Sequence, residues 1–107
     1  MPKIRLNNET GKVLGVWVEP LGEDFWMNPE DRFTLATVTP ESEDSDEAPF
    51  EVVFHDSGVS VCVNVGYEAV VHDRSGARVD CGHQRPVEIR QRWAEAAERA
   101  QERPPAP

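Results

Sequence analysis

The sequence predicts a mainly β fold, either an antiparallel β-sandwich or a small, partly open barrel, with one C-terminal α-helix. Short apolar segments rich in β-branched residues recur along residues 1–84, and turn-forming residues separate them. After Gly82 the apolar residues recur at helical spacing instead. Seven or eight short strands without intervening helices are typical of sandwiches and small barrels. The 107 residues suffice for one domain that buries a core without a disulfide or a metal.

The first half of the β region alternates strands with turns. A short strand is expected at residues 3–6, before turn-forming residues at 7–11. Residues 13–19 (VLGVWVE) are apolar on both faces, which is typical of a strand covered on both sides. Pro20 and Gly22 then fit a type I turn. This half ends with a brief apolar run at 25–27, a second proline turn at 28–31 and a β-branched strand at 33–39.

The second half of the β region predicts two hairpins. One joins residues 50–55 to residues 59–65, where four valines alternate with polar residues and indicate a strand with one buried face. The other joins residues 69–73 to residues 77–81. Segment 40–48 holds five acidic residues and nothing to bury, so we expect a loop at the edge of a sheet.

An amphipathic helix is expected after the β region. Pro86 suits the first helical position, and Ile89, Trp93 and Ala97 share one face. This face either docks on the β domain or pairs with a second copy through residues 86–103; docking is the simpler arrangement, because an exposed apolar stripe is unfavourable. The chain thus divides into a β domain at 1–84, a helix at 85–103 and a disordered tail at 104–107.

The charge of the chain limits its partners. The net charge is −9, and residues 1–84 hold six basic and sixteen acidic residues. Such a surface disfavours nucleic acid, which is bound by replacing counterions with Lys and Arg, and it attracts a basic protein. No apolar stretch resembles a signal peptide or a membrane span, so we expect a cytoplasmic protein without a membrane partner. In that compartment Cys62 and Cys81 are expected as reduced thiols, with a disulfide between them as the alternative.

One combination of residues points to a metal. His72, Cys81 and His83 carry nitrogen and sulfur ligands on a predicted hairpin and the residues that follow it. A small barrel with such ligands would resemble the cupins, a family that binds metal through a His-x-His pair, and the sequence has no such pair. Packed thiols and hydrogen-bonded histidines are the favoured interpretation, and neither a cofactor nor a catalytic set is expected.

The tryptophans and the acidic segment are the candidate partner-binding residues. Trp17 lies in the most apolar segment and is expected in the core. Trp26 lies between two turns, where it serves either as an exposed binding anchor or as a lid over one end of the sandwich. The acidic candidates are Glu41, Glu43, Asp44, Asp46 and Glu47.

Two segments resemble a set of short bacterial proteins of unknown function. The first begins at Trp17 and reads WVEPLGE, and a proline turn and a β-rich segment from Phe33 follow it. The second is the CGHQRP segment that begins at Cys81. The resemblance covers about residues 5–86 and implies a small all-β fold, with no activity to carry over.

Composition and motifs together favour a noncatalytic interaction module, comparable to an immunity or accessory protein, that binds a basic partner. Two alternatives stay open. One is a small cupin-like barrel that acts as an enzyme or ligand carrier, and the other is a structural subunit whose helix makes oligomers.

Overall fold

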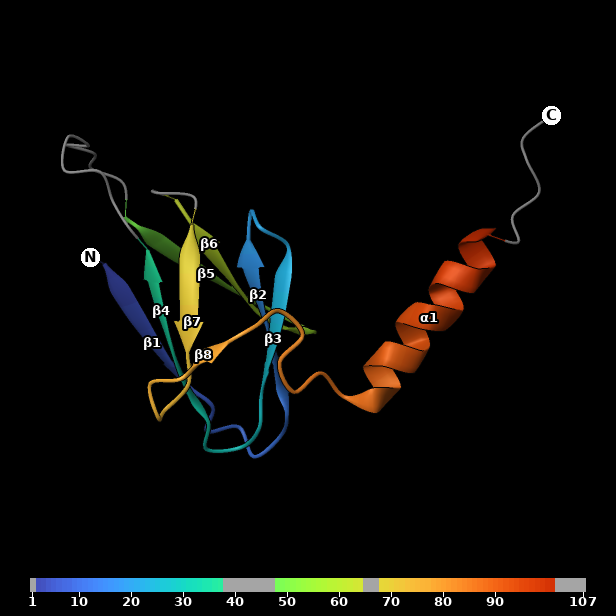
Figure 1. Cartoon of the computed structure of the whole chain (residues 1–107), viewed down its shortest axis with the longest axis horizontal. Helices are drawn as coiled ribbons and strands as arrows, with labels where there is room; N and C mark the ends of the chain where they lie inside the picture. The colour runs from blue at the N-terminus through green and yellow to red at the C-terminus, as the bar shows by residue number, and fades with distance from the viewer. Residues whose placement is uncertain (1, 38–47, 65–67, 102–107) are drawn as a thin grey trace.

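The β region forms two four-stranded sheets in a computed structural model that describes residues 2–37, 48–64 and 68–101 (Figure 1). In spatial order the first sheet contains Lys3–Asn7 (β1), Arg32–Thr37 (β4), Ala69–His72 (β7) and Arg78–Val79 (β8). The second contains Glu23–Met27 (β3), Leu14–Glu19 (β2), Gly58–Val63 (β6) and Phe50–His55 (β5). The sheets do not close into a barrel, and the predicted mainly β sandwich is confirmed.

Turn chemistry accounts for the hairpins. β5 and β6 join through the expected tight turn, and β7 and β8 join through the expected turn at residues 73–77. The apolar run at 25–27 is part of a full strand, because β3 pairs with β2 along its whole length. Within this β2–β3 hairpin the peptide bond between Glu19 and Pro20 is cis.

One pair of neighbouring strands differs from the antiparallel pairing that the sequence predicted. β2 and β6 run parallel, whereas every other pair of neighbouring strands is antiparallel. A tight turn fixes antiparallel pairing only for the two strands that it joins. β2 and β6 belong to different hairpins, so no turn sets their relative direction.

Alternating side chains from both sheets fill the core. It consists of Val16, Val18, Phe25, Met27, Phe33, Leu35, Val59, Val61, Val63, Val71 and Val79. The valines of β6 contribute as their alternation predicted. Phe54 alternates along β5 with Phe50 and Val52, so the three share one face, yet Phe54 is 81% exposed. It lies opposite Val59 near the end of β5, which is the edge strand of its sheet in the described part of the chain.

Asn8 fastens the connection between the two sheets. Its side chain is buried and donates to the carbonyl oxygens of Met27 and Lys12, at 3.0 and 2.7 Å. Its Oδ1 accepts from both the backbone N–H and the hydroxyl of Thr10. A buried amide is tolerated only when it is hydrogen-bonded, and this one fixes the chain where it passes from β1 to β2.

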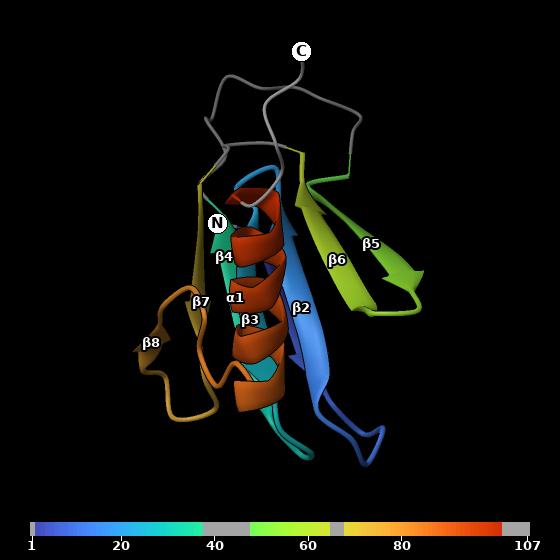
Figure 2. The same cartoon turned by 90° about the vertical axis from the view of Figure 1, so that its right-hand side faces the viewer.

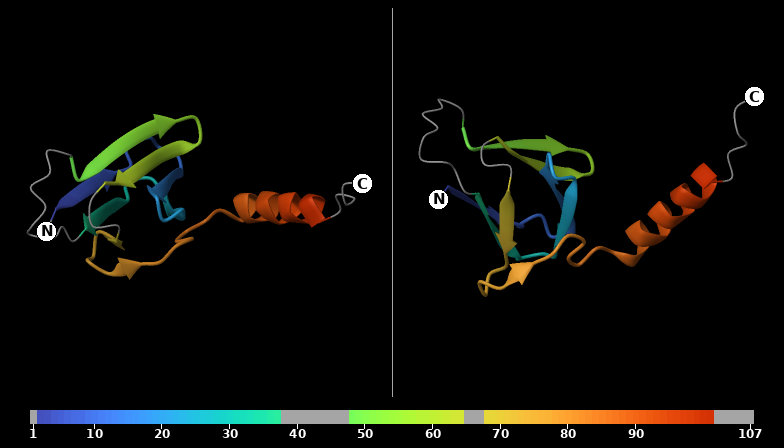
Figure 3. Two further views of the ribbon diagram at one scale, coloured as in Figure 1. Left: turned by 90° about the horizontal axis from the view of Figure 1, so that it is seen from above. Right: turned by 45° about the horizontal axis from the view of Figure 1, so that its top comes forward.

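The helix α1 (Val87–Gln101) projects from the β domain on the side of β2 and β3 (Figures 1 and 2). The Pro86 carbonyl accepts from the N–H groups of Ile89 and Arg90, so the helix begins where the sequence predicted. None of its residues is buried, and Figure 3 shows it extending away from both sheets. The prediction that the helix docks on the β domain is therefore wrong.

The composition of α1 explains why it does not dock. Three of its fifteen residues, Val87, Ile89 and Trp93, have large apolar side chains, and little apolar area is available to drive docking. Glu88 with Arg92, and Glu95 with Arg99, stand at i,i+4 spacing and support the helix without the domain. Residues 104–107, the predicted tail, lie outside the described residues.

No helix in the described part of the chain is long and apolar enough to cross a membrane.

Candidate functional site

Charge is segregated between the two sheets. The strands of the β3-β2-β6-β5 sheet contain four acidic residues and no Lys or Arg: Glu19, Glu23, Asp24 and Glu51. The strands of the β1-β4-β7-β8 sheet contain four basic residues and no Asp or Glu: Lys3, Arg5, Arg32 and Arg78. We call these the acidic sheet and the basic sheet. On the outer face of the acidic sheet Glu19 and Glu51 suit a basic partner, and on the outer face of the basic sheet Lys3, Arg5 and Arg32 suit an anionic one.

The outer face of the acidic sheet combines carboxylates with aromatic rings. Since the valines of β2 and β6 point inward, the alternate residues Trp17, Glu19, Ser60 and Cys62 point outward. Strand register places Glu19 and Glu51 on either side of Cys62, and places Val53 beside Ser60. We define the acidic-aromatic face as Trp17, Glu19, Glu51, Val53 and His55.

Trp17 occupies the centre of this face because two glycines make room for its ring. A Cβ at Gly15 would lie 2.7 Å from the Trp17 ring, and a Cβ at Gly58 would lie 3.2 Å from it. The ring packs edge-on against Trp26 at a centroid distance of 5.5 Å, and against His55 at 5.6 Å. Trp17 remains half-buried and is held on both sides, so little side-chain entropy is lost when a partner covers it.

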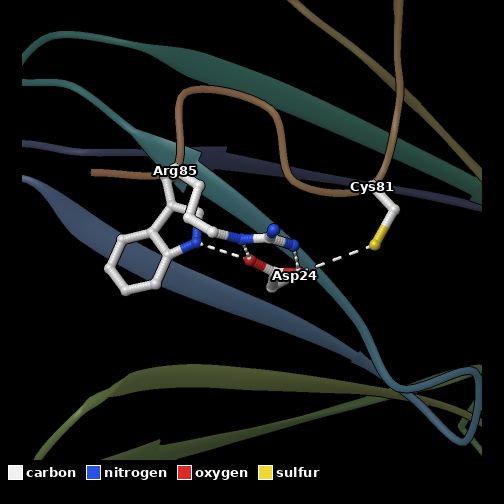
Figure 4. A network of polar contacts seen from close by, with 4 residues as sticks. Asp24, Cys81 and Arg85 are labelled. Carbon is white, nitrogen blue, oxygen red and sulfur yellow. Dashed lines mark hydrogen bonds and ion pairs between the residues drawn. The ribbon is translucent and has the colours of Figure 1, made fainter. Parts of the chain in front are cut away.

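The buried carboxylate of Asp24, on the strand beside this face, binds Arg85, which lies just before the helix (Figure 4). Asp24 on β3 is 4% exposed and forms a two-pronged ion pair with Arg85, with Arg85 Nε 2.7 Å from Oδ2. The indole N–H of Trp26 donates to the same Oδ2 at 2.7 Å. The Cys81 thiol donates to Oδ1 at 3.5 Å. A buried charge requires such partners, and these fix both Trp26 and Arg85.

Backbone bonds bring Arg85 to Asp24. The segment after β8 runs along β3, where the Gly82 N–H donates to the Asp24 carbonyl and the Trp26 N–H donates to the His83 carbonyl. Gln84 adds a bond from its side-chain amide to the Trp26 carbonyl at 2.8 Å. The guanidinium of Arg85 also lies over the ring of Trp93, 4.8 Å from its centroid. The same arginine therefore contacts the sheet and the helix.

The network stabilises the ionised form of Asp24. The hydrogen bond from Arg85 is the main cause that lowers the pKa of Asp24 to about 2, and Trp26 and Cys81 add to it against the effect of burial. The same ion pair raises the pKa of Arg85. Asp24 is ionised throughout the neutral range, so it has no proton to donate as a general acid.

Trp17 does not lie where the sequence predicted it, and one of the two alternatives for Trp26 is excluded. Trp26 is 6% exposed and cannot serve as the exposed anchor. Trp17, expected in the core, lies on the outer face. The segment around Trp17 is apolar on both faces, so the sequence gives no sign of which side is buried. Trp26 is covered because the segment after β8 crosses its strand, which local sequence does not show.

The candidate metal ligands do not come together. His72 points outward from β7, the Cys81 thiol contacts Asp24, and the His83 ring packs against Phe33 at 5.7 Å. Among the described residues, no three His, Cys, Asp or Glu side chains form a group that could hold a metal. The cupin-like alternative is therefore wrong for the residues on which it depended.

Both cysteines are free thiols, Cys62 partly buried on β6 and Cys81 exposed. The acidic candidates Glu41, Glu43, Asp44, Asp46 and Glu47 lie outside the described residues. Sequence reasoning missed Asp24 and Arg85, which are 61 residues apart and resemble ordinary surface charges. It also missed Glu19 and Glu51, which only the strand order brings together.

No protein-family model, no curated protein and no solved structure matches this chain.

Proposed function

We propose that this chain is a noncatalytic protein-interaction module, of the immunity or accessory type, that binds a basic protein partner on its acidic-aromatic face. One observation carries the proposal: four strands without a Lys or Arg present Glu19 and Glu51 in the row next to a preorganised Trp17. An aromatic anchor bordered by charge is the usual composition of a protein interface.

Charge and shape contribute different parts of this binding. The net charge of −9 attracts a basic partner at long range and raises the association rate at low salt. Trp17 and Val53, which is 44% exposed, supply apolar area for close contact. The acidic residues at 41–47 add to the long-range attraction. A cytoplasmic location would keep Cys62, which lies between Glu19 and Glu51, reduced.

The experiment compares capture of proteins from the cell of origin by immobilised wild type and by E19Q/E51Q. We expect the captured protein to have a basic pI, to elute as salt rises from about 0.05 to 0.5 M, and to bind E19Q/E51Q at least about tenfold more weakly. A second variant neutralises Glu41, Glu43, Asp44, Asp46 and Glu47, and should slow association without changing dissociation.

The matched control is E9Q/E88Q, which makes the same change in charge on the β1–β2 connection and on α1. It should retain binding within about twofold, because neither residue lies on the acidic-aromatic face. Capture that is insensitive to salt and to both sets of neutralising substitutions would contradict the proposal.

One observation favours a second candidate, a structural subunit that assembles through α1. The helix buries none of its residues, and Val87 and Trp93 are 63% and 40% exposed. A second copy could cover this stripe.

A further inference from the structure

The basic sheet carries a groove on its outer face, on the opposite side of the sandwich from the acidic-aromatic face. The groove has a volume of about 370 Å³. Side chains from three neighbouring strands and the turn after β7 contribute Lys3, Arg5, Arg32, Thr34, His72 and Arg74, which we call the basic groove. Residues 1–84 contain six basic residues in all, and four of them line this one surface.

Strand register arranges these side chains in rows across the sheet. Arg5 lies opposite Thr34, and Thr34 lies opposite His72, so one row presents a guanidinium, a hydroxyl and an imidazole. Lys3 lies toward one end of the sheet, beside Ala36. Arg32 lies toward the other end, beside Asn7. The rows point outward because the alternate residues of β4, Phe33 and Leu35, belong to the core.

The positive charge of the basic groove is not neutralised within the described part of the chain. The ion pair that the described residues do form joins Arg85 to Asp24, which belongs to the acidic sheet and lies outside the groove. Arg32 donates to the Asn7 side-chain oxygen at 2.8 Å, and Arg74 donates to the Glu30 carbonyl at 3.0 Å. Both bonds hold an arginine in place with a neutral acceptor, which leaves its charge available to a ligand.

The one acidic residue in the groove is already engaged. Asp73 accepts from the Ser75 hydroxyl at 2.6 Å and from the N–H groups of Ser75 and Ala77. The Ser75 hydroxyl is the main cause that lowers the pKa of Asp73. The carboxylate therefore shapes the turn after β7, and the groove keeps an excess of positive charge on a chain whose net charge is −9.

The spacing of the cations sets the size of the ligand. Lys3 and Asn7, which neighbours Arg32, are four residues apart on one strand, a separation of about 13 Å. β1 and β7 are two strand spacings apart, about 10 Å. A ligand with two or more oxyanion groups can contact the cations at both ends while their side chains extend straight outward. The groove volume lies in the range of small-molecule sites, which begins at about 300 Å³.

We propose that the basic groove binds a small polyanion that carries two or more oxyanion groups, either phosphates or carboxylates. Arginine forks bind both kinds of oxyanion in a two-pronged manner, and Thr34 and His72 add hydrogen bonds between the charges. This site is independent of the proposed protein-binding face, since the two lie on different sheets.

The experiment titrates the full chain with inorganic tripolyphosphate, citrate and inorganic phosphate, by calorimetry and by amide chemical shifts. We expect saturable binding of tripolyphosphate or citrate, at least about tenfold tighter than of inorganic phosphate, with shift changes in β1, β4 and β7. The tighter of the two polyanions distinguishes a phosphate-bearing ligand from a polycarboxylate.

Two exposed substitutions test the assignment to residues. R5Q should weaken binding of the preferred polyanion by about tenfold, and R5K should weaken it less because it keeps the charge and loses the fork. K12Q makes the same change in charge outside the groove and should change binding by less than about twofold. Equal losses in R5Q and K12Q, or no saturable binding of either polyanion, would overturn the proposal. E19Q/E51Q should bind the polyanion as the wild type does, so the two proposals fail separately.

Discussion

The two outer faces of this sandwich have the same strand architecture and opposite surface chemistry. The acidic sheet has a packed aromatic centre at Trp17, while the basic sheet has a groove lined by Arg5, Arg32 and Arg74. The acidic sheet also contains the parallel pair β2–β6, where two glycines let strands and rings approach closely. Under the two proposals, the protein partner makes apolar contact within a negative field on one side of the sandwich, and the polyanion makes ionic contact on the other.

The two faces also differ in how they treat charge. On the basic side, Arg32 of β4 and Arg74 of the turn after β7 are held by neutral acceptors. On the acidic sheet Asp24 is buried and needs a cation from outside the sheet, which Arg85 supplies. The acidic sheet therefore depends on a distant segment of the chain, whereas the basic groove depends only on its own strands and the turn beside them.

Gly58→Ala should break the acidic sheet and is expected to have the largest effect. Its Cβ would lie 2.2 Å from the Gly15 carbonyl oxygen, and the residue has φ of 144°. Strain and overlap together should lower the free energy of unfolding by about 4 kcal/mol, measured by urea denaturation. Gly11→Ala is the control: its φ is also positive, but nothing lies within 4 Å, so about 1 kcal/mol is expected. Similar losses of stability in both variants would show that the close contacts of Gly58 with Gly15 and Trp17 do not require a residue without a side chain.

The sequence predicted the elements of this fold better than their arrangement. Alternation in β6 and turn residues in the two hairpins are local signals, and both were confirmed. The segregation of charge was hidden, because a net charge summed along residues 1–84 mixes strands that alternate between sheets in chain order. Only the strand order shows that Lys3 and Arg32 belong to one face and Glu19 and Glu51 to the other.

The candidate site was difficult to predict for the same reason. Trp17 was expected in the core and lies on the outer face. Trp26 was left between an exposed anchor and a lid, because its burial depends on a segment almost sixty residues later. Asp24 follows Glu23 and looks like a surface acid until Arg85 reaches it. Helix docking was wrong because an apolar stripe was recognised, while its small apolar area was not weighed against the charged remainder of α1.

Arg85→Ala should have the next largest effect, because it leaves the buried Asp24 carboxylate without its cation. We expect the free energy of unfolding at pH 7 to fall by about 3 kcal/mol, toward the lower end of losses seen when a buried pair is broken, since Arg85 is partly exposed. Arg90→Ala removes an exposed helical arginine and should cost less than about 0.5 kcal/mol.

The pH dependence gives an independent measure of the same pair. The pKa of Asp24 is about 2 in the folded chain against 3.8 when unfolded, so ionisation of Asp24 stabilises the fold above pH 3.8. That contribution, about 2 kcal/mol, is lost as the pH falls through 3.8 toward 2. The difference in stability between wild type and Asp24→Asn should shrink by this amount over that range. A constant difference from pH 5 to pH 2 would contradict a strongly ionised Asp24.

Trp93→Ala should have the smallest effect, and it tests whether α1 makes an oligomer. The Trp93 ring is 40% exposed and its contact with the domain is the Arg85 guanidinium at 4.8 Å. An exposed cation–π contact is worth about 0.5–1 kcal/mol, so stability should fall by that amount, and Trp93→Phe should recover most of it. Under the interaction-module proposal, sedimentation velocity should give a monomer for wild type and variant alike. If wild type sediments as an oligomer that Trp93→Ala dissociates, the helix is an assembly element and the second candidate function replaces the first.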